Sequence, residues 1–212
     1  MGCGGTKKEI KNKSEIELLE KTRYVFVVGG PGSGKRTQCK KLAEEFGFRL
    51  LTIPEIIHYV IKLHIVQNWE EINKIYSESG EEGIESQHIV LFIQLVVKKL
   101  DEDKVLLEGF PRNKNDVQEW FRQTNDNLVE LYTVLYFDLP VEQMKIRQLA
   151  TQEDHVTEEE AKKRIAQFQR ETKPTFIDFE VLDKFIRVDA MLPVEDVFKA
   201  IKEEFILKKF YR

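Results

Sequence analysis

The sequence FVVGGPGSGKRTQC, from Phe26 to Cys39, joins an apolar run to a glycine-rich loop. The loop GGPGSGK satisfies the pattern G-x-x-x-x-G-K between a strand and a helix, which is typical of a phosphate-binding loop. Glycines let backbone N–H groups turn inward, the helix N-terminus adds its dipole, and Lys35 reaches the outer phosphates. The sequence therefore predicts a nucleotide phosphate site formed by Gly30, Gly32, Ser33, Gly34, Lys35, Arg36 and Thr37.

The rest of the chain alternates apolar runs with helical patterns. Strand candidates lie at 24–30, 48–53, 105–110, 133–138 and 185–190, and helical patterns fill most of the sequence between them. This alternation indicates an α/β fold with a parallel sheet, which binds ligands at the carboxyl ends of its strands. We expect a five-stranded parallel sheet of the P-loop NTPase type with helices on both faces, in one domain over 23–212.

Composition and charge exclude several classes of function. The 212 residues carry a net charge of -4, with a pI of about 5.7, so we expect no nucleic-acid partner. Two cysteines, Cys3 and Cys39, imply no disulfide framework and a reducing compartment. No apolar run reaches the length of a membrane span, and no secretory signal is visible. These features predict a soluble, cytoplasmic protein, which we expect to be a monomer.

The amino terminus, residues 1–22, is predicted to be a flexible tail. Its first residues, MGCGGT, fit the pattern for myristoylation of Gly2, and the neighbouring Cys3 is a potential palmitoylation site. One myristoyl chain binds a membrane weakly, so stable anchoring needs a second signal such as Cys3 or the nearby lysines. Acylation would associate the protein with a membrane surface. The alternative is a disordered tail whose match to a loose pattern is accidental.

Several motifs resemble those of one known family. GGPGSGKRTQC is similar to the phosphate loop of nucleoside monophosphate kinases, the adenylate kinase and UMP-CMP kinase group, which reads GGPGSGKGTQ. GFPRN, Gly109 to Asn113, resembles the motif whose arginine binds the acceptor monophosphate and whose asparagine contacts a pyrimidine. The run TKPTFIDFE also favours the UMP-CMP kinases. The resemblance extends from Tyr24 to about Lys202. It implies phosphoryl transfer between ATP, with Mg²⁺, and a nucleoside monophosphate such as CMP or UMP.

The resemblance also assigns roles to individual residues. Lys35, Arg112 and Arg164 would be catalytic, and a guanidinium such as that of Arg112 matches phosphate oxygens with two parallel hydrogen bonds. Asn113 would contact the acceptor base, and Glu108 replaces the acid that helps to hold magnesium. A helical acceptor-binding segment is expected at about 53–83.

Other cationic positions of the family are altered in this chain. His58 stands where relatives carry an arginine for the acceptor phosphate, and a surface histidine on a helix is the alternative interpretation. The lid segment at about 151–156 is short and vestigial. Both of its arginines are replaced, one by Ala150 or Thr151 and the other by Glu153. Instead, Thr157 followed by Glu160 predicts a capping box that starts a helix.

Two interpretations of Arg36, which replaces a glycine of the family, remain open. Arg36 either pairs with Glu108 and places a guanidinium near the magnesium position, or it points to solvent. The first would make nucleotide binding nearly independent of magnesium. Glu81, Glu82 and Glu85 are expected to form a solvated turn, and the four histidines show no metal-ligand spacing.

Two functions therefore remain for the chain as a whole. The first is an ATP-dependent nucleoside monophosphate kinase with impaired activity, because one arginine finger in phosphoryl transfer contributes about 10³–10⁵ in rate. The second is a nucleotide-binding, membrane-anchored scaffold or regulatory protein with little or no transfer activity. The sequence alone does not decide whether the chain is an enzyme.

Overall fold

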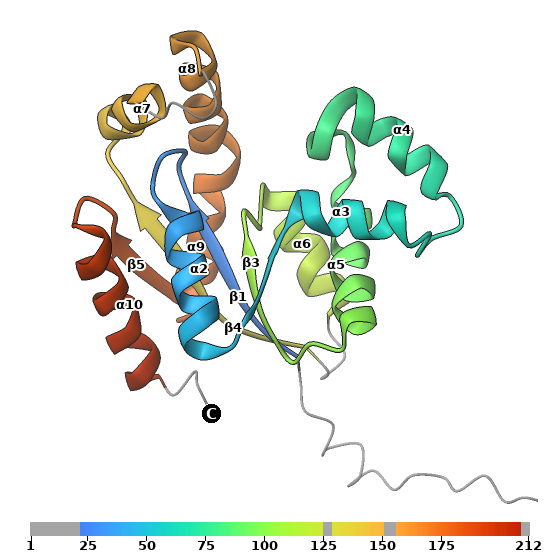
Figure 1. Cartoon of the computed structure of the whole chain (residues 1–212), viewed down its shortest axis with the longest axis horizontal. Coiled ribbons are helices and arrows are strands. Elements are labelled where there is room, and N and C mark those ends of the chain that lie inside the picture. The colour runs from blue at the N-terminus through green and yellow to red at the C-terminus, as the bar shows by residue number, and fades with distance from the viewer. Residues whose placement is uncertain (1–21, 125–128, 151–155, 209–212) are drawn as a thin grey trace, which may run out of the picture.

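A computed structural model describes residues 22–124, 129–150 and 156–208 of the chain. They form a five-stranded parallel sheet with helices on both faces, as predicted (Figure 1). The strand order is β2-β3-β1-β4-β5. The first strand begins at Thr22, one residue inside the predicted tail. The strands are β1 (Thr22–Gly29), β2 (Arg49–Thr52), β3 (Lys104–Glu108), β4 (Val129–Asp138) and β5 (Phe185–Asp189).

Helices cover both faces of the sheet because the central strands are apolar on both sides. On one face, the ring of Phe26 in β1 packs edge-on against Trp120 and Phe179. These two rings belong to α6 (Lys114–Gln123) and α9 (Phe176–Val181). On the other face, α2 (Lys35–Phe46) and α10 (Val194–Leu207) pack together, with Phe46 against Phe205. Burial of one large apolar side chain contributes about 1.5–3 kcal/mol, so these layers account for much of the stability.

Two groups of helices stand beyond the carboxyl ends of the strands, on opposite sides of a gap (Figure 1). One is the predicted acceptor-binding segment: α3 (Ile53–Lys62), α4 (Trp69–Ser79) and the short turn η1 (Gly80–Gly83). It is followed by α5 (Ser86–Leu100). The other group is α7 (Val141–Ala150), α8 (Glu158–Gln167), the π-helical turn η2 (Phe168–Thr172) and η3 (Lys173–Thr175).

The start of α8 confirms the predicted capping box. Thr157 Oγ1 accepts a hydrogen bond from the backbone N–H of Glu160, and the Glu160 carboxylate accepts one from the N–H of Thr157 at 2.9 Å. The same arrangement, which was not predicted from the sequence, joins Thr52 and Glu55 at the start of α3. Of the predicted lid at 151–156, all but Val156 lies outside the described residues.

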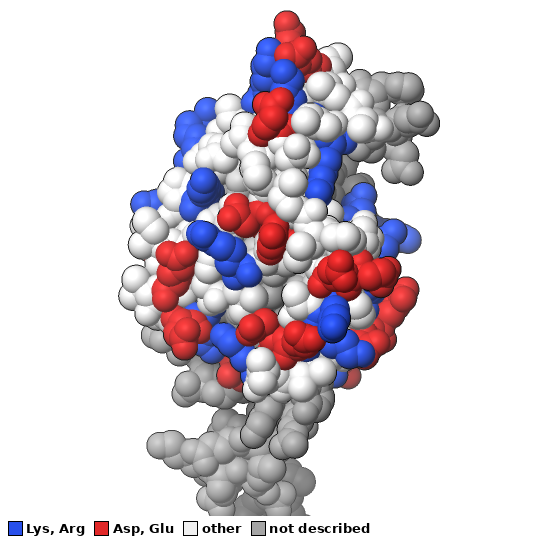
Figure 2. Space-filling model, turned by 90° about the vertical axis from the view of Figure 1, so that its left-hand side faces the viewer, with Lys and Arg blue, Asp and Glu red and all other residues white. Residues whose placement is uncertain are grey.

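The surface mixes charges of both signs. Figure 2 shows the side of the molecule that carries α10, where Lys and Arg side chains are interspersed with Asp and Glu. Such a face produces no extended field of one sign that would attract a polyanion. In the described parts of the chain, no helix combines the length and apolar character needed to cross a bilayer.

Replacing Thr157 with alanine should destabilise the fold by about 1 kcal/mol, because both hydrogen bonds of the capping box depend on its side chain or its geometry. For a chain of this size, the melting temperature should fall by roughly 2–4 °C in a thermal unfolding experiment. Glu159→Gln in the same helical turn is the control, since Glu159 takes no part in the box. An unchanged melting temperature for Thr157→Ala would contradict the capping role.

Candidate nucleotide-binding cleft

A cleft of about 1110 Å³ lies at the carboxyl ends of β1 and β3. The phosphate loop forms its floor, the η1 turn one wall, and α8 with η2 the opposite wall. Of the residues predicted from the sequence, it brings together Lys35, Arg112, Asn113 and Arg164. Ligands of parallel α/β folds bind at this edge of the sheet, as expected.

The phosphate loop has the backbone geometry of an anion site. Gly32 and Gly34 adopt positive φ angles of 75° and 82°, which favour glycine, and Gly34 is the N-cap residue of α2. No side chain caps α2, and its first turn carries no acidic residue. A Cβ added to Gly30 would lie 2.4 Å from the side chain of Met144, so α7 packs directly on the loop. The helix N-terminus is therefore held in place with N–H groups available for an anion.

Lys35 is folded back onto the loop from which it starts. Its Nζ donates hydrogen bonds to the carbonyl oxygens of Gly29 (2.8 Å) and Gly30 (3.0 Å) and to Ser33 Oγ (3.4 Å). Burial lowers the pKa of Lys35, and the nearby Glu108 carboxylate opposes that effect. Phosphate oxygens would replace these neutral acceptors with charged ones, which form stronger hydrogen bonds.

Glu108, at the end of β3, carries a buried carboxylate oxygen. Its Oε2 has no hydrogen-bond partner among the described residues. Burial raises the pKa of Glu108, while the charges of Lys35 and Arg36 lower it. Arg36 is exposed, and in the described structure it forms no ion pair with Glu108, so the paired arrangement is not observed.

The loop and Glu108 together fit ATP with a hydrated magnesium ion. The described residues contain no group of three or more His, Cys, Asp and Glu side chains that could enclose a metal. Mg²⁺ usually keeps several waters and is held by one or two carboxylates together with substrate phosphates. The unpartnered oxygen of Glu108 opposite the loop suits that arrangement.

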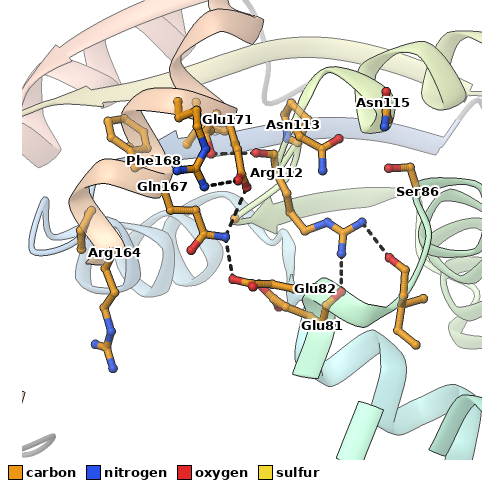
Figure 3. A pocket seen from close by; sticks show the side chains of 18 of the residues that line it. Glu81, Glu82, Ser86, Arg112, Asn113, Asn115, Arg164, Gln167, Phe168 and Glu171 are labelled. Carbon is orange, nitrogen blue, oxygen red and sulfur yellow. Dashed lines mark hydrogen bonds and ion pairs between the residues drawn. The ribbon is translucent and has the colours of Figure 1, made fainter. Parts of the chain in front are cut away.

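Arg112, at the far end of the cleft, binds groups of the protein itself (Figure 3). Its Nε and Nη2 donate to the two carboxylate oxygens of Asp116, both at 2.9 Å. Its Nη1 donates to the carbonyl oxygen of Glu81 at 2.5 Å, and Nη2 also donates to that of Ile84 at 3.3 Å. Thr172 Oγ1 donates to the backbone carbonyl oxygen of Arg112 at 2.8 Å. The bonds to Glu81 and Ile84 thus join the η1 turn to the segment after β3, and the bond from Thr172 joins η2 to the same segment.

A second bond joins the η1 turn to the opposite wall. Gln167 Nε2, at the end of α8, donates to the Glu82 carboxylate at 2.6 Å and to Glu171 at 3.3 Å (Figure 3). Burial raises the pKa of Glu81, and the positive charge of Arg112 opposes that shift. The acidic turn expected to be solvated is thus a wall of the cleft, because Arg112 and Gln167 hold it there.

Among the other predicted site residues, Asn113 and Arg164 line the cleft and His58 does not. Asn113 Oδ1 accepts the N–H of Asp116 and so caps α6. Arg164 is exposed on α8 and extends on the other side of the cleft from Arg112 (Figure 3). His58 does not line the cleft: it is exposed on α3, and its Nδ1 lies 2.8 Å from the carbonyl oxygen of Pro54. Gly2 and Cys3 lie outside the described residues.

Sequence reasoning missed Asp116, Gln167 and Thr172. For Asp116 a signal was present, because it follows Arg112 by four residues, a spacing at which opposite charges pair at the start of a helix. Gln167 and Thr172 contact residues 85 and 60 positions away, and no local pattern predicts such pairs.

Comparison with known proteins identifies the family. The model of the adenylate kinase family matches residues 27–183. The chain belongs to this family. It is similar to UMP-CMP kinase 3 of Oryza sativa subsp. japonica, with 31% identity over 88% of this chain and 87% of the relative. UMP-CMP kinase of Homo sapiens is 30% identical over 87% of this chain and 97% of its own. The matched residues of this adenylate kinase family member include the phosphate loop, Glu108, Arg112, Asn113 and Arg164.

Replacing Glu108 with glutamine should stabilise this family member at neutral pH. The folded-state pKa of Glu108 is raised, so burying its charged form costs stability above that pKa and costs nothing below the unfolded value. Thermal unfolding should show a melting temperature raised by roughly 2–4 °C at pH 7, with the gain shrinking toward pH 4. Glu203→Gln on the surface of α10 is the control. A destabilised variant at pH 7 would show that attraction to Lys35 outweighs burial.

Proposed function

We propose that this protein binds ATP with Mg²⁺ in the cleft and transfers a phosphoryl group to a nucleoside monophosphate, CMP or UMP, at an impaired rate. The observation that carries the proposal is the intact phosphate loop, with Lys35 near Glu108, whose Oε2 has no hydrogen-bond partner among the described residues. The relatives' names, UMP-CMP kinases, support the choice of acceptor.

Each residue of the cleft would act by binding and orientation. The loop N–H groups and Lys35 would hold the ATP phosphates, and Glu108 would orient the hydrated Mg²⁺. When bound, that ion supplies positive charge that stabilises the transferring group. Arg164 would approach the phosphates from the opposite wall, and Asn113, which lines the cleft, would contact the acceptor base.

Impaired transfer is proposed because few cations are available to the reacting phosphates. Arg112 is engaged by Asp116, and the sequence of the predicted lid contributes no arginine or lysine between 151 and 156. Catalysis of phosphoryl transfer depends almost entirely on positioning and electrostatic stabilisation. Fewer cations therefore mean a slower chemical step.

The alternative function is a nucleotide-binding scaffold or regulatory protein with little or no transfer activity. The internal pairing of Arg112 favours it, since the group expected to bind the acceptor is occupied. Under this alternative, nucleotide binding would persist without turnover.

Lys35→Ala should abolish ATP binding at concentrations that saturate the wild type, because the loop loses the cation whose Nζ lies against its backbone carbonyl groups, where the phosphates would bind. A coupled assay with ATP, Mg²⁺ and CMP, UMP or AMP measures turnover in parallel. Lys99→Ala on α5, remote from the loop, is the control and should match the wild type. Turnover that depends on Lys35 supports the kinase, and Lys35-dependent binding without turnover supports the scaffold. Nucleotide binding unaffected by Lys35→Ala would overturn both.

We also propose that the protein is cytoplasmic and associates with membranes through acylation of Gly2, reinforced by Cys3 or by the lysines that follow. The support is the coincidence of lipid acceptor, neighbouring cysteine and basic residues at the amino terminus. Expressed in cells fed an alkyne-labelled myristate, the protein should incorporate label, and Gly2→Ala should incorporate none. Cys3→Ser should keep the label but move from the membrane to the soluble fraction. An unlabelled wild type would refute the proposal.

A further inference from the structure

The guanidinium of Arg112 is almost fully used inside the protein. Of its five N–H groups, the Nε–H and one Nη2–H bind Asp116, the other Nη2–H binds the Ile84 carbonyl, and one Nη1–H binds the Glu81 carbonyl. One N–H therefore remains without an acceptor among the residues that the structure describes. The Arg112 side chain is 12% exposed, and that of Asp116 is 0% exposed. An incoming phosphate thus meets a cation whose charge is already balanced.

Asp116 is fixed where it can compete for that cation. It lies in the first turn of α6, where the helix dipole favours a carboxylate, and its own N–H is held by Asn113 Oδ1 at 3.1 Å. Its Oδ2 also accepts the backbone N–H of Arg112 at 2.8 Å. A planar carboxylate that binds both Nε and Nη2 occupies the edge of the guanidinium that suits a phosphate.

We propose that Asp116 is an affinity-determining residue of the acceptor site: its carboxylate occupies Arg112 and thereby lowers the affinity of the site for the phosphate of a nucleoside monophosphate. This inference rests on the proposed function and deepens it. Arg112 binds phosphate only when it leaves Asp116, and the apparent affinity falls by the fraction of molecules in which it has left. Cytidine carries no phosphate and so makes no demand on the Arg112 guanidinium, and under this proposal its affinity should not depend on the exchange.

A positioning role for Asp116 would have the opposite consequence. If its carboxylate oriented Arg112 toward phosphate, removing the negative charge would weaken monophosphate binding. The number of internal bonds favours competition, because an oriented donor needs free N–H groups and Arg112 has one. The two roles therefore differ in the sign of a single measurement.

The test is isothermal titration of CMP and of cytidine into the full chain and its Asp116→Asn variant. We expect the wild type to bind CMP and cytidine within about threefold of each other. In Asp116→Asn, CMP should bind about tenfold tighter while cytidine is unchanged, a difference of about 1.4 kcal/mol. Asp103→Asn is the matched control, because it breaks an arginine ion pair with Arg23 outside the cleft. In Arg112→Ala with Asp116→Asn, the gain should vanish, which locates it at Arg112.

Each remaining outcome overturns the inference. Weaker CMP binding by Asp116→Asn would show positioning, and an unchanged ratio of CMP to cytidine affinity would show no coupling. Absence of CMP binding in every variant would show that releasing Arg112 creates no phosphate site. If Asp116→Asn fails to fold, as judged by thermal unfolding, Asp116→Ser, which removes the charge with a smaller side chain, is used instead. ATP binding measured in the same variants reports the phosphate loop separately, so failure of the proposed function is recognised on its own.

Discussion

The parallel pairing of β1 with β3 is the constraint on which the cleft depends. Val27 lies opposite Glu108 in this ladder, and the N–H of Gly109 donates to the Val27 carbonyl at 2.9 Å. The phosphate loop begins two residues after Val27, and the segment that carries Arg112 begins directly after Glu108. One backbone register therefore places Lys35, Glu108 and Arg112 along the same edge, although 77 positions separate the first from the last. The rings of Trp120 in α6 and Phe179 in α9 pack against Phe26 on one face of the sheet, and this packing helps to fix the pairing of β1 with β3.

The two ends of the cleft differ in the partners of their charged groups. Lys35 binds neutral oxygen atoms, whereas Arg112 binds a carboxylate. At the phosphate loop, Lys35 has neutral acceptors and Glu108 has an oxygen without a partner, so both groups have unused capacity for a charged ligand. At the acceptor end, Arg112 and Asp116 satisfy each other, and the η1 turn contributes carbonyl oxygens. A buried group binds a ligand only by exchanging its existing partners, and the exchange is more favourable where those partners are neutral. Under the proposed function, the ATP end of the cleft would therefore bind its ligand more readily than the acceptor end.

The sequence predicted the fold, the phosphate loop and the start of α8, because local rules govern each of them. Strand periodicity, glycine conformations and the Thr157–Glu160 capping box all act within a few residues. The family resemblance assigned Lys35, Arg112, Asn113 and Arg164 to one site, and the structure brings these four residues together in the cleft. The sequence did not predict hydrogen bonds between residues that lie far apart along the chain. Glu82 and Glu85 are exposed, as expected of a solvated turn, but the sequence did not show that Arg112 and Gln167 bind this turn. For His58 the sequence left a phosphate ligand and a surface histidine open, and the structure has it exposed on α3.

The residues that stabilise the fold differ from those proposed to bind phosphates, so the fold would persist even if phosphoryl transfer were impaired. The apolar layers around Phe26, Trp120 and Phe205 are buried and lie away from the cleft, so charges at the cleft can change without disturbing them. Cations that surround a reacting phosphate repel one another in the absence of ligand and therefore cost stability. Pairing Arg112 with Asp116 removes such a cost: it gives a buried guanidinium two charged hydrogen bonds and anchors the η1 turn. The arrangement that makes the empty cleft more stable is thus the same one that makes it a poorer acceptor site.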